Sequence, residues 1–112
     1  MFPNNQTEEI TPTELKRRRD AGEDLQVIDV REQREYDYAQ IPDSKLIPLG
    51  EIINRMGEID ENRETVVSCH HGSRSAQAIF LLTRAGFKGT LLNHKGGIDA
   101  YSNEVDPNVP KY

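Results

Sequence analysis

The chain has 112 residues, of which 35% are hydrophobic and 29% charged, and its net charge is −5. This length suits one core, so we expect a single domain over residues 1–112. No apolar run approaches the ~20 residues that span a bilayer, and the start, MFPNNQTEEI, lacks the basic and apolar regions of a secretion signal. The acidic balance argues against a nucleic-acid-binding surface. We therefore expect a cytoplasmic protein that binds neither membranes nor nucleic acid.

Helical and strand patterns alternate along the chain. Thr11 and Pro12 are typical of a helix start, because a threonine side chain caps free N–H groups and proline suits the first turn. β-Branched runs around Val27 and Val66 are typical of buried strands, and apolar residues at 52, 53, 56 and 59 have helical spacing. In chain order we expect helix 11–21, strand 25–30, helix 32–38, strand 45–49, helix 50–59, strand 65–69, helix 75–85, strand 89–93 and helix 98–105. This alternation predicts an α/β fold with a mostly parallel sheet.

The two ends and one basic run complete the chain. Residues 1–9 are expected to be an N-terminal extension, and residues 106–112, which contain two prolines, an irregular tail. The run Lys16–Arg19 has the composition of a nucleic-acid patch, but acidic residues lie on both sides of it. We therefore interpret the run as the solvated face of the first helix.

Cys69 is the only cysteine of the chain. One cysteine excludes an internal disulfide, a Cys-x-x-Cys redox pair and a zinc site with two or more thiolates. A lone cysteine is often an inert apolar residue of the core. Its surroundings in the sequence must therefore decide between packing and chemistry.

The residues after Cys69 have the features of an anion-binding loop. Cys69 ends a predicted strand, and the next six residues are polar or glycine and lead into a helix. At such a place the free N–H groups and the dipole of a helix N-terminus favour a thiolate. Gly72 permits a tight loop with inward-facing amides, and Arg74 adds a charge suited to an anionic substrate. We predict that Cys69 is a nucleophile and that its substrate site is lined by His70, His71, Gly72, Ser73, Arg74 and Ser75.

Other chemistry at this loop has weaker support. Zinc would have to use Cys69 with His70, His71 and His94, but adjacent residues of a tight loop rarely point at one metal, and no carboxylate is suitably spaced. We therefore predict no metal. The two histidines of the loop have three possible roles: lining the mouth of the pocket, assisting proton transfer or attracting anions. A serine triad lacks the G-x-S-x-G elbow.

Several groups of residues, in this order and spacing, resemble the rhodanese-type domain family over nearly the whole chain. They are Asp29-Val30-Arg31 with Glu35-Tyr36, Ile41-Pro42 with Ile47-Pro48-Leu49, the Cys69–Ser75 loop, and Gly96-Gly97-Ile98 with Ala100-Tyr101. The resemblance implies a rhodanese-like three-layer α/β fold, with a five-stranded parallel sheet and helices on both faces. The loop and the tail are most similar to the C-terminal rhodanese domain of molybdopterin-synthase adenylyltransferases. We expect such a domain standing alone, or a fragment of a larger protein.

The family resemblance also implies a reaction. The cysteine of sulfur-transferring members accepts a sulfur atom, becomes a persulfide and passes that sulfur to a nucleophile. We therefore predict a sulfurtransferase similar to thiosulfate sulfurtransferase, with a Cys69 persulfide and no other cofactor. The expected donor is a small anion such as thiosulfate, or a protein persulfide such as that of a cysteine desulfurase. The expected acceptor is cyanide, a thiol or a sulfur-carrier protein. Asp29 and Arg31 are predicted to support the loop, with a surface ion pair as the alternative.

Three other functions fit parts of the pattern. Related phosphatases and arsenate reductases have a loop one residue longer, which suits a tetrahedral oxyanion, whereas the six-residue span Cys69–Arg74 favours sulfur. A partner-binding module without activity would be expected to have lost the cysteine. An oxidative sensor would have no second cysteine for an internal disulfide.

Overall fold

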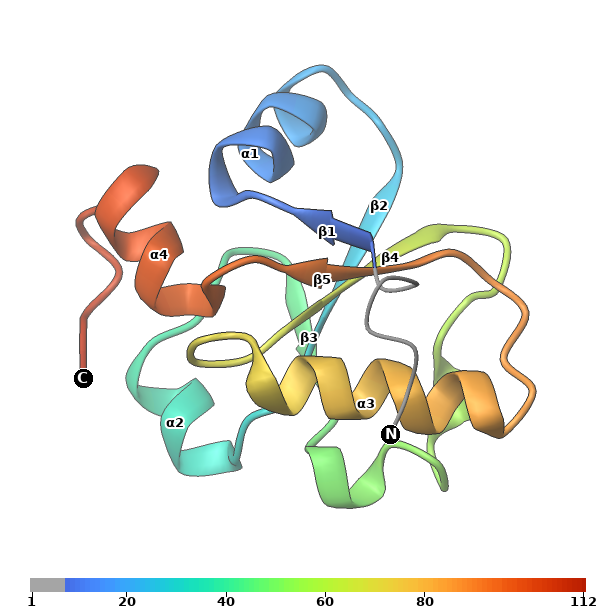
Figure 1. Cartoon of the computed structure of the whole chain (residues 1–112). Helices are drawn as coiled ribbons and strands as arrows, with labels where there is room; N and C mark the ends of the chain where they lie inside the picture. Colours follow the sequence, from blue (N-terminus) through green and yellow to red (C-terminus); the bar gives the residue numbers. More distant parts are fainter. Residues whose placement is uncertain (1–7) are drawn as a thin grey trace.

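Five parallel strands form one sheet in the order β1-β5-β4-β2-β3 (Figure 1). The computed structural model describes residues 8–112. The strands are β1 Glu8–Ile10, β2 Leu25–Asp29, β3 Ser44–Leu46, β4 Glu64–Ser68 and β5 Leu91–His94. The helices are α1 Pro12–Asp20, α2 Gln33–Tyr38, α3 Ser73–Arg84 and α4 Gly97–Glu104, with short 3-10 helices η2 Leu49–Glu51 and η3 Met56–Glu58. The predicted α/β fold with a five-stranded parallel sheet is confirmed.

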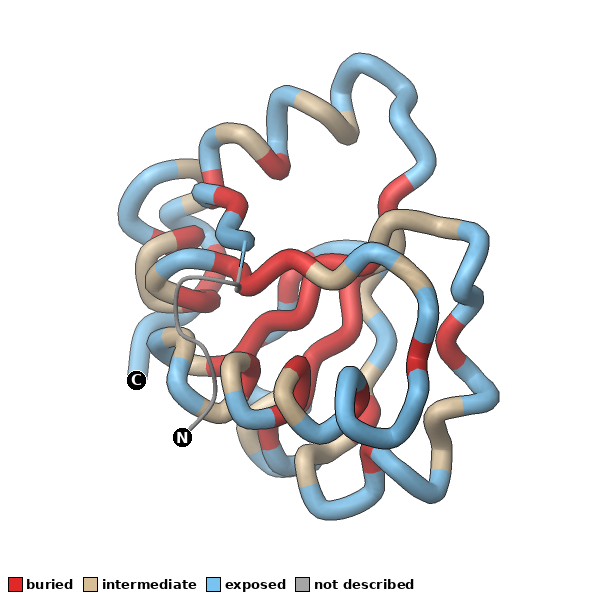
Figure 2. Tube along the Cα trace, turned by 45° about the vertical axis from the view of Figure 1, so that its right-hand side comes forward, coloured by how far each residue is buried: buried red, intermediate tan, exposed pale blue. Residues whose placement is uncertain are grey.

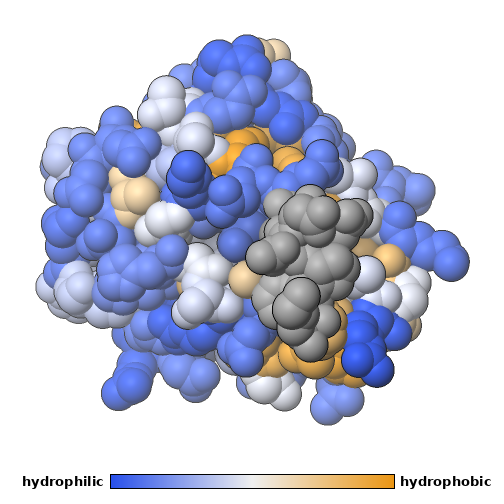
Figure 3. Space-filling model, viewed as in Figure 1, coloured by the Kyte–Doolittle hydropathy of each residue, from blue (hydrophilic) through white to orange (hydrophobic). Residues whose placement is uncertain are grey.

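Helices cover both faces of the sheet, because successive residues of a strand point to opposite sides. Val66 of β4 belongs to a buried cluster that includes Leu15 of α1 and Ile98 of α4. The next residue, Val67, belongs to a second cluster that includes Leu82 of α3. Figure 2 shows the buried strands between the helices of the two faces. The outer face of the molecule that Figure 3 draws is mostly hydrophilic. The strand positions thus define the three layers.

Helix α1 begins as the sequence predicts. The backbone N–H of Glu14 donates to Oγ1 of Thr11 at 3.1 Å. Lys16 pairs with Asp20 at 2.6 Å within the helix. Arg17 pairs with Glu14 at 2.7 Å. Lys16 and Arg17 thus lie on a solvated helix face, as expected, and are balanced by acids of the same helix. Arg18 differs, because its side chain is only 17% exposed and pairs with Glu23 and Glu64.

The N-terminal extension expected over residues 1–9 is wrong at its end, because it overlaps a strand. Glu8–Ile10 form β1, an edge strand that pairs with Leu92–His94 of β5. Three residues with two adjacent glutamates carry no strand pattern of their own, so the pairing with β5 creates this strand. Residues 1–7 of the expected extension lie outside the described residues.

The helix predicted over residues 50–59 is wrong. The segment contains only the two 3-10 helices η2 and η3. Ile52 and Ile59 are buried as a helical stripe would require, but Ile53 is 42% exposed. Gly50 and Gly57 disfavour a continuous helix, and the buried isoleucines hold the irregular backbone against the core instead.

The other predicted elements have the correct type, with ends shifted by a few residues. The tail 106–112 forms neither helix nor strand, as predicted, but it is anchored. Val109 is buried, and its carbonyl oxygen accepts a hydrogen bond from Oγ of Ser102 at 2.7 Å. The tail then runs from α4 toward α2 (Figure 1). Among the described residues, no helix has the length and apolar character needed to cross a membrane.

We predict that Leu82→Ala lowers the free energy of unfolding by about 2–5 kcal/mol, because it removes a fully buried side chain and leaves a cavity. Leu81→Ala is the matched control, since Leu81 is 38% exposed and the loss of its side chain should cost about 0.5 kcal/mol. Urea denaturation measures both losses. Equal losses would contradict the assignment of the α3 core face.

Candidate active site

Cys69 directly follows β4, the central strand, at its carboxyl end. Its side chain is 1% exposed and lies in the buried cluster on the α3 side of the sheet. The chain then turns through Gly72, the N-cap of α3, whose φ of 116° is accessible to glycine at little cost. This turn brings the N-terminus of α3 to the sulfur atom.

Among the described residues, two polar groups contact the sulfur of Cys69. The backbone N–H of Gly72 donates to Sγ at 3.0 Å, and Oγ of Ser75 lies 3.4 Å from Sγ. Ser75 is held in place by Asn93, whose Oδ1 accepts from its hydroxyl at 2.5 Å. Asn93 Nδ2 also donates to the carbonyl of Gly72 at 3.2 Å. One side of the buried sulfur thus meets a backbone donor and a hydroxyl, although the residue also packs in an apolar cluster.

Helix α4 determines the path of the loop from the other side. The N–H of Ile98 donates to the carbonyl of Cys69 at 2.9 Å, and that of Asp99 donates to the carbonyl of His70 at 3.2 Å. Gly97, with φ +61°, lies so close to the loop that a Cβ atom would clash with both carbonyl oxygens. The loop carbonyls are therefore turned toward α4.

Arg74 binds Glu35 of α2 through two hydrogen bonds, of 2.7 and 2.9 Å. The guanidinium of Arg74 lowers the pKa of Glu35 to about 2, and the carboxylate in turn raises the pKa of Arg74. Arg74 therefore braces the loop against α2, and Glu35 offsets much of the positive charge that the sequence assigns to substrate. No local pattern in the sequence assigns Glu35 this role, because its partner Arg74 lies on another helix.

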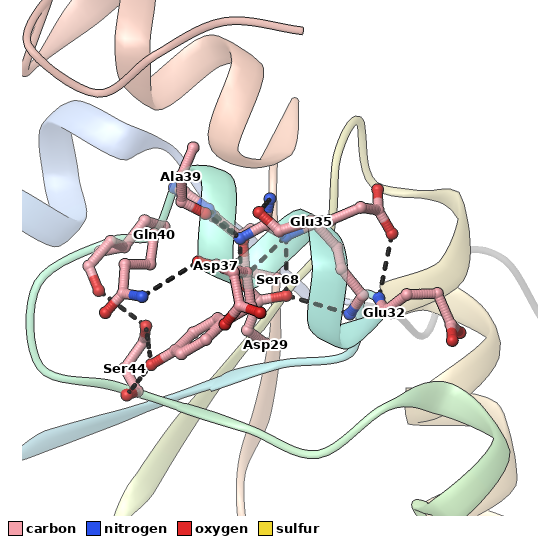
Figure 4. A network of polar contacts seen from close by, with 12 residues as sticks. Asp29, Glu32, Glu35, Asp37, Ala39, Gln40, Ser44 and Ser68 are labelled. Atoms are coloured by element: carbon pink, nitrogen blue, oxygen red, sulfur yellow. Dashed lines mark hydrogen bonds and ion pairs between the residues drawn. The ribbon is translucent and has the colours of Figure 1, made fainter.

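Asp29 and Arg31 form a buried ion pair at 2.7 Å, with side chains 1% and 0% exposed. The alternative of a surface ion pair is therefore wrong. Arg31 also donates to the carbonyl of Ala39 at 2.6 Å and to the hydroxyl of Tyr112 at 2.8 Å. Figure 4 shows Asp29, Glu35 and Ala39 in one polar network between β2 and α2. Within the described residues, neither Asp29 nor Arg31 hydrogen-bonds to residues 69–75, so any support for the loop passes through Glu35 and Tyr112.

His70 lies between two aromatic rings. The ring of Tyr112 stacks on it at 4.1 Å and 10°, and the ring of His71 lies 3.9 Å away on a tilt of 39°. Burial lowers the pKa of His70. Tyr112 also donates to Oε2 of Glu35 at 2.8 Å. Tyr112 could not be identified from the sequence, because an aromatic residue in an irregular tail has no pattern that places it over a loop.

Within residues 8–112, the groups suited to a metal gather at His70, His71 and Asp99, whose ligand atoms lie within 4.8 Å of one another. The expectation that no carboxylate reaches the histidines is wrong, because α4 brings Nε2 of His71 to 3.7 Å from Asp99. Asp99 already pairs with Lys111 at 3.1 Å. Cys69 does not belong to this group.

Two remaining candidates lie apart from the sulfur contacts. Ser73 is exposed at the first turn of α3, and its side chain has no hydrogen bond within the described residues. His94 is buried at the end of β5, where Nδ1 lies 2.9 Å from Oγ of Ser68 and Nε2 has no hydrogen-bond partner among residues 8–112. Burial lowers the pKa of His94 to about 4. His94 is therefore a neutral core residue, away from the group of possible metal ligands.

The fold agrees with comparisons with known proteins. A model of the family described as "Rhodanese-like domain" matches residues 11–104. The chain belongs to the rhodanese-like domain family, as the resemblance in the sequence implies.

Two curated relatives are named for sulfur chemistry. The chain is 42% identical over 83 residues to YrkF of Bacillus subtilis (strain 168), which is named as a sulfur carrier protein. The match covers 74% of this chain and 45% of YrkF. It is 35% identical over 105 residues to MoeZ of Mycobacterium tuberculosis (strain CDC 1551 / Oshkosh), named as an adenylyltransferase/sulfurtransferase; the match covers 92% of this chain and 26% of MoeZ. The chain thus spans less than half the length of both relatives. The second match confirms the expected similarity to adenylyltransferases that carry a rhodanese domain.

A solved structure shows the same fold. The crystal structure of a rhodanese-like domain protein from Staphylococcus aureus superposes with a TM-score of 0.80 and 28% identity. The match covers 95% of this chain and 99% of that chain. The whole described architecture is therefore that of a rhodanese-like domain.

We predict that Gly97→Ala displaces the loop at Cys69, because the new Cβ would clash with the carbonyls of Cys69 and His70. Gly86→Ala is the matched control: its φ is +94°, but no atom lies within 4 Å of the new Cβ. The control should lose about 1–2 kcal/mol from left-handed backbone strain alone, and Gly97→Ala clearly more. Thermal unfolding and the reactivity of Cys69 toward a thiol reagent measure both effects. Indistinguishable variants would refute the close contact.

We also predict that protonation of His94 weakens the fold in mild acid. Its folded pKa of about 4 lies below the ordinary value of 6.5, so the unfolded chain binds more protons between these values. Stability from this group is complete above pH 6.5 and is lost as the pH falls toward 4. His94→Asn should reduce that loss in urea titrations, whereas His71→Asn, at an exposed position, should not. Unchanged pH dependence in His94→Asn would contradict this assignment.

Proposed function

We propose that this chain is a sulfurtransferase that carries sulfane sulfur as a persulfide on Cys69. One observation carries the proposal: Sγ of Cys69 sits at the N-terminus of α3 and accepts the N–H of Gly72 at 3.0 Å. A helix N-terminus and a backbone donor stabilise a sulfur anion. The family membership supports the same chemistry, and so do the names of YrkF and MoeZ.

The proposed reaction has two steps. In the first, the thiolate of Cys69 attacks the outer sulfur of thiosulfate, and the S–S bond of the donor breaks to release sulfite and leave a persulfide. In the second, a nucleophile attacks the outer sulfur of the persulfide. The new S–S bond of the protein then breaks, and its electron pair returns to Sγ of Cys69. With cyanide as the nucleophile, the product is thiocyanate.

The surrounding residues have distinct roles in this proposal. Gly72 stabilises the negative charge on sulfur, since its N–H donates to Sγ. Ser75 contacts Sγ, but its hydroxyl donates to Asn93, so Ser75 helps to hold the sulfur pocket in shape. The ion pair of Arg74 and Glu35 keeps the loop in position against α2. The ring of His70, the residue after Cys69, is held in place by stacking on Tyr112. In the cell, the proposed partners are a protein persulfide such as that of a cysteine desulfurase, as donor, and a thiol or sulfur-carrier protein, as acceptor.

The test follows sulfur by mass. After incubation with thiosulfate, wild-type protein should gain one sulfur atom by intact mass, lose it on addition of cyanide and produce thiocyanate. Cys69→Ser should gain no sulfur and should produce thiocyanate only at the rate of a reaction without protein. Circular dichroism shows whether that variant keeps the fold.

A second assay separates the rival chemistry. p-Nitrophenyl phosphate should not be hydrolysed, because the short loop is expected to exclude a tetrahedral oxyanion. Thiocyanate formation by Cys69→Ser at the wild-type rate would overturn the proposed function. Phosphate release without sulfur loading would favour a phosphatase instead.

A further inference from the structure

A cleft lies beside the loop, between α2 and the tail. It has a volume of about 440 Å³ and is lined by Arg34, Glu35, Tyr38 and Tyr112. Ligand pockets in proteins commonly have volumes of about 300–1,000 Å³. The space is therefore large enough for a small molecule of a few residues, and none of the roles above uses it.

Two walls of the cleft contact the Cys69–Ser75 loop directly. Tyr112 stacks on His70, the residue after the proposed nucleophile. Glu35 binds Arg74 through both of its carboxylate oxygens. A molecule in the cleft would consequently lie against the same residues that form the rim of the sulfur site.

The cleft has exposed aromatic walls. Tyr38 is 58% exposed and Tyr112 44%, and their rings meet edge to face at 6.0 Å and 83°. Tyrosine rings provide rigid apolar surface with polar tips, and for this reason they are common where proteins bind peptides and other ligands. The hydroxyl of Tyr112 is already bonded to Arg31 and Glu35, so its ring is held in place without a ligand.

Arg34 provides an unused positive charge at this cleft. Arg34 is exposed, and within residues 8–112 its guanidinium has no hydrogen bond or ion pair. The neighbouring arginines are both occupied, Arg31 by Asp29 and Arg74 by Glu35. Glu35, the acid that lines the cleft, is neutralised by Arg74. The positive charge of Arg34 is therefore available to a ligand, although the net charge of the chain is −5. A guanidinium is well suited to bind a carboxylate.

We propose that this cleft is the binding site of the sulfur acceptor, a small peptidic thiol that carries a carboxylate. Arg34 binds the carboxylate, and the rings of Tyr38 and Tyr112 flank the peptide. The acceptor thiolate attacks the outer sulfur of the Cys69 persulfide, that S–S bond breaks, and its electron pair returns to Sγ of Cys69. This inference rests on the proposed function, since it assigns the acceptor of the same reaction.

The test uses protein that has first been loaded with sulfur from thiosulfate, so that only the second step is measured. Glutathione, its diethyl ester and cyanide are added in turn, and the loss of one sulfur is followed by intact mass. Wild-type protein should reach half its maximal rate at a lower concentration of glutathione than of the ester. Arg34→Gln should raise that concentration about fivefold for glutathione, since an exposed ion pair contributes up to about 1 kcal/mol. It should leave the ester and cyanide unchanged.

Matched variants make the result specific. Arg84→Gln removes the same charge from an exposed position at the far end of α3 and should behave as wild type with all three acceptors. Tyr38→Ala should weaken saturation by glutathione and by the ester alike, because both use the aromatic wall. Equal saturation of Arg34→Gln and Arg84→Gln by glutathione would overturn the acceptor site. So would a loss of the cyanide reaction in Arg34→Gln. Failure of the proposed function would be distinct: wild-type protein would never load sulfur.

Discussion

The fold around Cys69 depends on the contact between two helix N-termini and one short loop. Helix α3 directs its free N–H end toward the sulfur, whereas α4 donates to the carbonyls of Cys69 and His70. Since each peptide group points its N–H and C=O in opposite directions, fixing the carbonyls against α4 restricts where the loop amides point. Gly97 makes this possible, because any larger residue would separate α4 from the loop. The chemical environment of the sulfur is therefore a consequence of helix packing.

A second set of contacts connects this loop to the outside of the domain. The buried pair of Asp29 and Arg31 contacts Ala39 and Tyr112, and Glu35 joins Arg74 to Tyr112. A buried charge is costly to leave without its partners. The contacts of Arg31 therefore hold α2 and the tail in one arrangement relative to β2. Glu35 and Tyr112 thus contact the loop after Cys69 and also line the neighbouring cleft. In this arrangement, the tail is packed against the loop.

Local patterns predicted most of the secondary structure. Proline, glycine and capping residues act through nearby backbone groups, and for this reason the start of α1 and the type of each main helix could be predicted. β1 could not, because Glu8–Ile10 become a strand only when they pair with β5. The segment 50–59 failed for the opposite reason: helical spacing was present, but the glycines and the packing of Ile52 and Ile59 favoured two short turns.

The sequence by itself determined the layered fold, the family and the candidate nucleophile, because these follow from strand and helix patterns and from motifs contiguous in the chain. The tertiary structure decided which distant groups surround that nucleophile. Asn93 supports Ser75 from another strand, Glu35 neutralises Arg74 from another helix, and Tyr112 covers His70 from the end of the tail. No local pattern encodes these contacts, because each depends on the distance between segments that are far apart in the chain and come together only when the sheet and both helix layers have packed.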